Sequence, residues 1–374
     1  MPDVSLPAAS ESLVLGTAAA TLAELRDRIR EADSRRTPLR LLGGGTKDFY
    51  GQQLDGEPLS TRKLAGIVSY EPTELVVTVL AGTPLAELEA ALAERRQFLA
   101  FEPPHFGAGA TVGGMIACGL SGPRRASAGA ARDFVLGAAM LDHRGELLRF
   151  GGQVMKNVAG YDVSRLLCGS LGILGLVVEV SLKVLPVPAQ EATLRLSLSG
   201  PDALDRFNRW AGQPLPISAT RHAGNEAWVR LSGAPAAVEA AVARIGGERV
   251  DAGAAASGWA ALREHRDPFF DRTATDAPLW RLSVPSASPP LALPGAQLIE
   301  WGGALRWLRS DADAAAIRDA AAAAGGTATL FRGGDKRAGA FSPLPDTILR
   351  LHRNLKRQFD PNGIFNPGRM YAGL

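Results

Sequence analysis

Cysteine is scarce in this sequence, which has only Cys118 and Cys168 among its 374 residues. Two cysteines cannot form the disulfide framework of a small secreted protein, and they make no C-x-x-C pair with metal-ligand spacing. The five histidines form no H-x-x-x-H or similar pair either, so we expect no bound metal. The low cysteine content is typical of a protein from a reducing compartment.

Charge of one sign and long apolar runs are missing as well. The 41 basic and 38 acidic residues give a formal net charge of +3 and are spread along the chain, so we expect no nucleic-acid partner. No apolar run reaches the roughly 18 residues that cross a bilayer. Residues 1–10 lack the basic start and apolar stretch of a secretory signal. We therefore expect a soluble cytoplasmic protein without a transmembrane segment, or one attached to a membrane through a partner.

The length of the chain exceeds that of one ordinary core and predicts two or three packed units. The first helix is indicated by Thr21 as N-cap with Glu24 three residues later, which is a capping-box pattern. Leu22, Leu25 and Ile29 then share one face of that helix. A second helix opens at residues 83–84 and places three leucines on one face, Leu85, Leu88 and Leu92.

Strands follow the first helix, and a domain boundary follows the strands. The last strand alternates and stops at Pro186 and Pro188, where we place the boundary. We expect one side of that strand to carry Val178, Val180, Leu182 and Val184. The strands of this first part are predicted at residues 39–42, 67–70, 75–80, 134–141, 146–150 and 176–185, with a hairpin turn at 142–145.

The part after the prolines has the element order β-α-β-β-α-β, which predicts a ferredoxin-like half at residues 192–251. A weaker copy of the same order follows at residues 279–331. The last helix is predicted at residues 345–358, and the prolines and glycines of residues 359–369 then force a compact turn.

Three glycine-rich segments are the strongest functional signals. The first, Gly43-Gly44-Gly45-Thr46-Lys47, comes directly after a buried strand. Glycine permits positive φ and leaves backbone N–H groups uncovered by side chains, so this loop could cradle a phosphate. It could equally be a plain tight turn. The second segment, residues 107–122, could approach a flat ring or serve helix packing, and the third is residues 169–175. None fits the G-x-G-x-x-G of a Rossmann site.

The order of these motifs resembles the vanillyl-alcohol-oxidase family of flavoproteins. The similarity covers residues 38–186 and 345–369, and it includes the stretch 157–162 and the D-P-x-G-x-x-N-P-G tail. More narrowly, residues 119–125, 156–162 and 301–307 resemble the FAD-binding subunits of bacterial glycolate oxidases. The resemblance implies an α+β fold with a PCMH-type FAD-binding domain of two α/β subdomains at residues 1–187. A ferredoxin-like cap domain would span 188–335, and residues 336–374 would return to the FAD domain.

The resemblance also implies which residues bind FAD. Members with covalent flavin carry a histidine in the first loop or a cysteine in the second. Thr46 and Lys47 stand at the position of that histidine, and Cys118 is more simply a small buried thiol, so non-covalent FAD is expected. Leu171 replaces a glutamate frequent in the family, and we assign it no role. The implied cofactor residues are Gly43, Gly44, Gly45, Thr46, Lys47, Asp48, Ala110, Thr111, Cys118, Gly119, Leu120, Ser121, Gly172, Leu174, Gly175 and Val177.

By the same resemblance, the chain would be one subunit of a glycolate oxidase. It would work beside a larger FAD-containing subunit and an iron–sulfur subunit, oxidise glycolate to glyoxylate and be peripheral at the inner membrane through these partners. An alternative is a flavin-carrying electron-transfer or assembly subunit without its own substrate site, because the histidine-rich substrate and metal motif of related dehydrogenases is lacking. A third reading is a stand-alone reductase of the enolpyruvyl-glucosamine type, in which NADPH would bleach the flavin.

A small 2-hydroxy acid needs a basic group for its carboxylate and a base near its hydroxyl. The catalytic residues stay unknown at this stage. An arginine pair can also simply lie on a face exposed to solvent, and a lone histidine can simply pack in the core. The candidates in suitable segments are His105, Arg124, Arg125, Lys156 and Tyr161.

Overall fold

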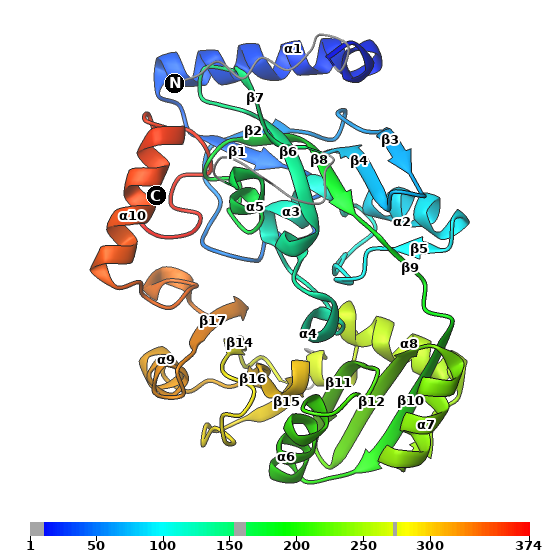
Figure 1. The fold of residues 1–374 in the computed structure, drawn as a ribbon. Helices are drawn as coiled ribbons and strands as arrows, with labels where there is room; N and C mark the ends of the chain where they lie inside the picture. Colours follow the sequence, from blue (N-terminus) through cyan, green and yellow to red (C-terminus); the bar gives the residue numbers. More distant parts are fainter. Residues whose placement is uncertain (1–10, 153–161, 272–274) are drawn as a thin grey trace.

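The structure is a computed structural model that describes residues 11–152, 162–271 and 275–374, with side chains from residue 18 onward in these ranges. The strands form one five-stranded sheet, one eight-stranded sheet and two small two-stranded sheets. Figure 1 shows the two large sheets in separate halves of the molecule, with the N-terminal and C-terminal helices both beside the five-stranded one. Both large sheets are antiparallel, which confirms the predicted α+β class.

The first helix, α1 (Glu11–Arg35), begins well before the position that the sequence predicted. Leu22, Leu25 and Ile29 are buried along one face, as predicted. Thr21 lies inside the helix and is not its N-cap, so the capping-box prediction is wrong. The physical reason is that the alanines before Thr21 are strong helix formers, and the helix continues through them.

The five-stranded sheet has the order β3-β4-β8-β6-β7 and is covered on both faces. On one face, Leu22 and Ile29 of α1 pack with Leu141 of β6. On the other face lie α2 (Leu85–Glu94) and α3 (Val112–Cys118), whose buried side chains pack with the strands. The predicted hairpin is confirmed as the β6–β7 pair. The strands are β3 (Ile67–Glu71), β4 (Val76–Leu80), β6 (Val135–Leu141), β7 (Leu147–Gly151) and β8 (Leu176–Lys183).

Strand β8 lies in the centre of this sheet, and its residues 176–182 are all buried. The prediction that Val178 shares a side with Val180 and Leu182 is wrong. Val178 packs in the core under α1, whereas Val180 and Leu182 pack in the core under α2 and α3. The register between β6 and β8 shifts at Ala139/Met140, and such a bulge reverses the facing of the residues on either side.

The C-terminal segment returns to the start of the chain. Helix α10 (Asp346–Phe359) is followed by a turn whose Ile364 carbonyl accepts a hydrogen bond from the Leu39 N–H at 2.7 Å. Leu39 belongs to β1 (Leu39–Leu42), which pairs in parallel with β2 (Glu57–Ser60). The predicted strand at residues 39–42 is thus confirmed, and the chain end lies against it (Figure 1).

The first half of the eight-stranded sheet has the strand order β13-β10-β12-β11. This is the 4-1-3-2 order of a ferredoxin-like fold, and it confirms the predicted β-α-β-β-α-β half. The elements are β10 (Gln190–Ser197), α6 (Gly200–Ala211), β11 (Ile217–Ala223), β12 (Glu226–Gly233), α7 (Pro235–Ile245) and β13 (Glu248–Arg249).

The second half repeats this order as β15-β16-β14-β17, and it is joined to the first through the β11–β15 pair. No helix is described between its first two strands, which is why its signal in the sequence is weaker. The sequence did not predict α8 (Ala252–Arg263), which precedes this half. The elements are β14 (Leu279–Ser283), β15 (Ala296–Glu300), β16 (Leu305–Arg309), α9 (Ala314–Ala323) and β17 (Thr327–Arg332).

Short elements connect the two halves. Strand β9 (Leu185–Pro186) pairs with β5 (Gln97–Phe98) before the chain enters β10. The division into domains at residues 1–187, 188–335 and 336–374 stays a prediction, and the change of sheet between β9 and β10 is compatible with its first boundary. The short helices are α4 (Arg125–Ala128) and α5 (Val163–Leu167).

Candidate functional site

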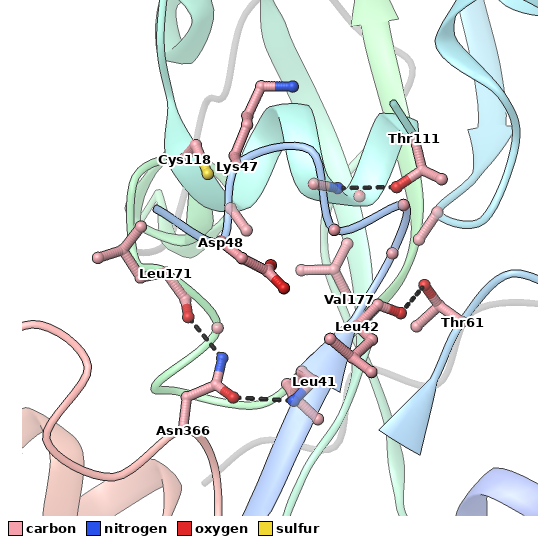
Figure 2. Close-up of a pocket in the computed structure, with 18 of the residues that line it drawn as sticks. Leu41, Leu42, Lys47, Asp48, Thr61, Thr111, Cys118, Leu171, Val177 and Asn366 are labelled. Atoms are coloured by element: carbon pink, nitrogen blue, oxygen red, sulfur yellow. Dashed lines mark hydrogen bonds between the residues drawn. The ribbon is translucent and has the colours of Figure 1, made fainter. Parts of the chain in front are cut away.

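A cleft lies where the three glycine-rich segments of the first half meet. Its floor is the turn from β1 into residues 43–48, and its walls come from α3 and from residues 171–177 (Figure 2). The cleft encloses about 780 Å³ of space, its mouth included. Segments more than 100 residues apart in the sequence therefore line one site.

Glycine is required at the floor because the first two segments touch backbone to backbone. A Cβ on Gly44 would lie 1.4 Å from the carbonyl oxygen of Gly109, and one on Gly43 would lie 2.2 Å from Oγ1 of Thr111. Gly45 has a φ of +74°, in the left-handed region that favours glycine. The triple glycine thus sets both the turn and the closeness of the second segment.

The turn leaves backbone donors unused. Within the described residues, the N–H groups of residues 43–47 donate to no protein acceptor, whereas the next one, of Asp48, donates to the Gly45 carbonyl at 3.1 Å. Successive free N–H groups around a residue with positive φ form a concave anion-binding site. The floor of the cleft can therefore bind a phosphate group through main-chain hydrogen bonds.

Two cations stand at this floor without a carboxylate partner. Among the described residues, neither Lys47 nor Arg369 has an acidic side chain within 4.0 Å. Lys47 donates to the His105 carbonyl at 3.1 Å, and burial lowers the pKa of its ammonium. Arg369 donates to the Asp48 carbonyl at 2.9 Å. Because backbone carbonyls neutralise no charge, both cations favour an anionic ligand in the cleft.

The third segment and the chain end are tied to β1 by one side chain. Asn366 accepts a hydrogen bond from the Leu41 N–H at 2.8 Å and donates to the Leu171 carbonyl at 2.7 Å (Figure 2). A Cβ on Gly172 would lie 2.8 Å from Nδ2 of Asn366, so glycine is needed there too. The tail therefore fixes the spacing between the floor and the third wall.

The structure brings most of the predicted cofactor residues together. Those that line the cleft are Gly43, Gly44, Gly45, Thr46, Lys47, Asp48, Thr111, Cys118, Gly172, Gly175 and Val177. Ala110 and Leu174 are instead buried in the core, and Gly119 ends α3 in the left-handed conformation. Leu120 and Ser121 lie in a second cavity on the far side of that turn. All of these assignments to FAD stay predictions.

Sequence reasoning missed several residues of the cleft. Asn366 and Arg369 had been noted only as part of a compact turn, and nothing local indicated that this turn reaches the glycine loop. Leu171 had been set aside, yet it lies in the third wall with a φ of +54°. The further lining residues are Leu41, Leu42, Leu54, Thr61, Ala81, Gly113, Gly114, Ala117 and Leu176.

The structure describes three of the five residues predicted as candidates for binding the substrate. Arg124 is 7% exposed and forms ion pairs with Glu102 and Glu191, so its charge is already neutralised and it does not lie on a solvated face. His105 pairs with Glu89 at 3.0 Å. Arg125 stacks on the Trp301 ring, 4.5 Å from its centroid. Lys156 and Tyr161 lie outside the described residues, so their roles stay predictions.

Within residues 11–152, 162–271 and 275–374, no group of three or more His, Cys, Asp or Glu side chains could bind a metal ion. In the same ranges, no helix has the length and apolar character needed to cross a membrane.

The thiol of Cys118 lines the cleft and allows a test of covalent chemistry. Burial raises its pKa to about 11, so roughly one thiol in a thousand is a thiolate at pH 8. We expect iodoacetamide to alkylate Cys118 about two orders of magnitude more slowly than free cysteine at pH 8, as measured by mass spectrometry. Cys168, whose pKa burial raises to about 12, serves as the internal comparison. Fast alkylation of Cys118 alone would contradict this account.

The chain is similar to known flavoproteins. Residues 17–151 match the family model described as FAD binding domain. The chain is 50% identical over 350 residues to the glycolate oxidase subunit GlcE of Escherichia coli (strain K12), which covers 94% of this chain and 97% of that protein. It is 33% identical over 153 residues to the glycolate oxidase subunit GlcD of Bacillus subtilis (strain 168), covering 41% of this chain and 32% of that protein.

A solved structure supports the same architecture. Alkyldihydroxyacetonephosphate synthase superposes with a TM-score of 0.63 at 16% sequence identity, over 92% of this chain and 75% of that one. An identity this low shows the fold alone. Together with the matched FAD binding domain, it confirms the predicted PCMH-type fold.

Proposed function

Because this chain belongs to the family of the glycolate oxidase subunit GlcE, we propose that it is the FAD-binding subunit of a glycolate oxidase. The resemblance that the sequence motifs predicted is thereby confirmed, and so is the prediction of FAD as cofactor. The chain is an FAD-dependent oxidoreductase. Its substrate in this proposal is glycolate, and the product is glyoxylate.

The observation that carries the proposal is the cleft with unused N–H groups and unpaired cations. In our proposal, residues 43–47 bind the pyrophosphate through main-chain hydrogen bonds, and Lys47 and Arg369 balance its charge. Residues 171–177 and the start of α3 line the rest of the cofactor. Bound flavin supplies the redox chemistry by taking two electrons and hydrogen from the alcohol carbon. The chain's own groups bind and orient the two molecules.

We further propose that the chain works within a complex. The GlcE and GlcD relatives are each named as a subunit of a glycolate oxidase, which supports a multi-subunit assembly. A larger FAD-containing subunit and an iron–sulfur subunit would be its partners, and the latter would take electrons onward from the flavin. In this proposal the complex is cytoplasmic and contacts the inner membrane through those partners.

The cofactor is tested by an absorption spectrum of the purified chain before and after acid precipitation. We expect flavin bands near-stoichiometric with protein, and we expect all of the flavin in the supernatant after precipitation. Among the described residues that line the cleft there is no histidine, and burial keeps the Cys118 thiol protonated. A colourless chain that gains no thermal protection from excess FAD would contradict the proposal that the chain binds FAD. Flavin that stays in the pellet would contradict non-covalent binding only.

Substrate oxidation is tested by adding glycolate anaerobically to the FAD-loaded chain. We expect the oxidised flavin bands to bleach, since electrons leave the alcohol and no acceptor removes them. A chain that binds FAD but does not bleach, alone or with its co-purified partners, would support the flavin-carrying electron-transfer or assembly role instead. Bleaching by NADPH would indicate the reductase alternative.

A further inference from the structure

A second cavity lies between the turn after α3 and the eight-stranded sheet. It encloses about 320 Å³, its mouth included, and is much smaller than the FAD cleft. Cys118 lines the FAD cleft, and Leu120, two residues later, lines this cavity, so the two sites share one short segment of chain. Six lining residues matter below: Phe106, Leu120, His265, Arg281, Glu300 and Trp307.

Two arginines line this cavity, Arg263 and Arg281 of β14, and Arg263 is paired with Glu264 at 2.9 Å. Among the described residues, the Arg281 guanidinium has no acidic partner within 4.0 Å and no hydrogen bond to a protein acceptor. It lies over the Trp301 ring at 5.2 Å from the centroid, and burial lowers its pKa. A guanidinium taken out of water without a carboxylate is costly, and its five donors have a fixed fork geometry. The Arg281 guanidinium is therefore suited to bind an anionic ligand.

Two polar groups share the cavity with Arg281. Nδ1 of His265 is buried and has no hydrogen-bond partner in the part of the chain that the structure describes, and the ring is stacked on Phe270 with centroids 3.9 Å apart. Burial holds the pKa of His265 well below its usual value, so the imidazole is neutral. Glu300 accepts a hydrogen bond from Nε1 of Trp307 at 2.7 Å, and burial raises its pKa to about 7. Both groups can accept a hydrogen bond from a ligand hydroxyl.

The remaining walls are aromatic. The ring centroids of Trp307 and Phe331 are 4.9 Å apart, and those of His265 and Phe106 are 4.8 Å apart. Rings packed in this way exclude water and strengthen charge interactions within the cavity. A small ligand with one anionic end and one hydroxyl matches the polarity of the site.

We propose that Arg281 binds the carboxylate of a small 2-hydroxy acid in this cavity, with Glu300 and His265 facing its hydroxyl. This inference rests on the proposed function, since it names the substrate site of that oxidase. Arg124 and His105, which the sequence had favoured, are paired with Glu102 and Glu89, whereas Arg281 has no acidic partner among the described residues. The segment shared with the FAD cleft would bring the substrate close to the cofactor.

The test is calorimetric titration of the full-length, FAD-loaded chain with oxalate, a two-carbon carboxylate that cannot give up hydrogen. We expect Arg281→Met to weaken oxalate binding by about ten- to a hundredfold, the range for a lost charge-assisted hydrogen bond pair. Arg281→Lys should recover only part of the affinity because an ammonium lacks the guanidinium fork. The matched control is Arg318→Met. It removes a cation that lies over the ring of Trp280, the residue before Arg281 in β14.

FAD affinity, measured separately by flavin fluorescence, should be unchanged in Arg281→Met. If this variant binds FAD and oxalate like the unchanged chain, the inference is wrong and the proposed function survives. If the unchanged chain binds FAD but no oxalate or glycolate, the inference is likewise overturned. If Arg281→Met does not fold, Arg281→Lys decides, because equal oxalate affinity in that variant would refute a fork-dependent site. If the unchanged chain binds no FAD, the proposed function itself fails.

Discussion

Gly44→Ala is expected to lower FAD affinity by about a hundredfold or more, which corresponds to roughly 3 kcal/mol. The new Cβ would lie 1.4 Å from the carbonyl oxygen of Gly109, far inside contact distance. The Cβ is fixed directly to the backbone and the oxygen is part of it, so no side-chain rotation can relieve the overlap. The first two glycine segments must separate, and the floor of the cleft then loses its arrangement of N–H groups.

Two other glycines make the experiment selective. A Cβ on Gly109 would meet Nη2 of Arg62 at 3.2 Å and the carbonyl oxygen of Gly44 at 3.3 Å, much longer distances than the 1.4 Å at Gly44, so Gly109→Ala should cost clearly less affinity. Gly212 ends α6 with a φ of −81°, and its Cβ would have no contact closer than 3.7 Å, so Gly212→Ala should bind FAD normally. Fluorescence titration with FAD gives the affinities, and circular dichroism without FAD reports folding. Equal affinities for Gly44→Ala and Gly212→Ala would contradict the proposed floor.

The local parts of this fold could be predicted from the sequence because their signals are local. A buried strand that runs into three glycines can be recognised within ten residues, and the structure has β1 and its turn there. The prolines likewise indicated the change from β9 to β10, where the chain enters the eight-stranded sheet. The ferredoxin-like order also followed from the sequence of elements alone, because helices and strands have different periods.

The parts that could not be predicted depend on contacts between distant residues. Asn366 joins Leu41 and Leu171 across separations of 325 and 195 residues, and no pattern in its own turn specifies these partners. The reversal at Val178 depends on a bulge that forms only against β6. Arg281 looks like an ordinary strand residue in the sequence, because its lack of an acidic partner among the described residues is a property of the packed cavity. Local patterns therefore predict elements and glycine turns, whereas packing decides which charges remain free.

Lys356→Met is expected to destabilise the protein by about 3–5 kcal/mol, the range for breaking a buried ion pair from one side. Nζ of Lys356 donates to Asp360 at 2.6 Å and to the carbonyls of Ile173 and Phe365 at 2.7 and 2.8 Å. The side chains of Lys356 and Asp360 are 7% and 0% exposed, so neither charge can turn to water. The free energy of unfolding is measured by urea denaturation. Arg353→Met is the control, on an exposed position of the same helix.

The same ammonium connects the chain end to the cofactor cleft, and this coupling makes the prediction specific. Ile173 lies between Leu171 and Gly175, which both line the cleft, and Phe365 precedes Asn366. Losing Lys356 should therefore also lower FAD affinity, by about tenfold, because it loosens the third wall. Lys356→Met combined with Asp360→Asn should regain part of the stability, since no buried charge is then left alone. If Lys356→Met matched Arg353→Met in both stability and FAD affinity, the tail would not be supporting the cleft in this way.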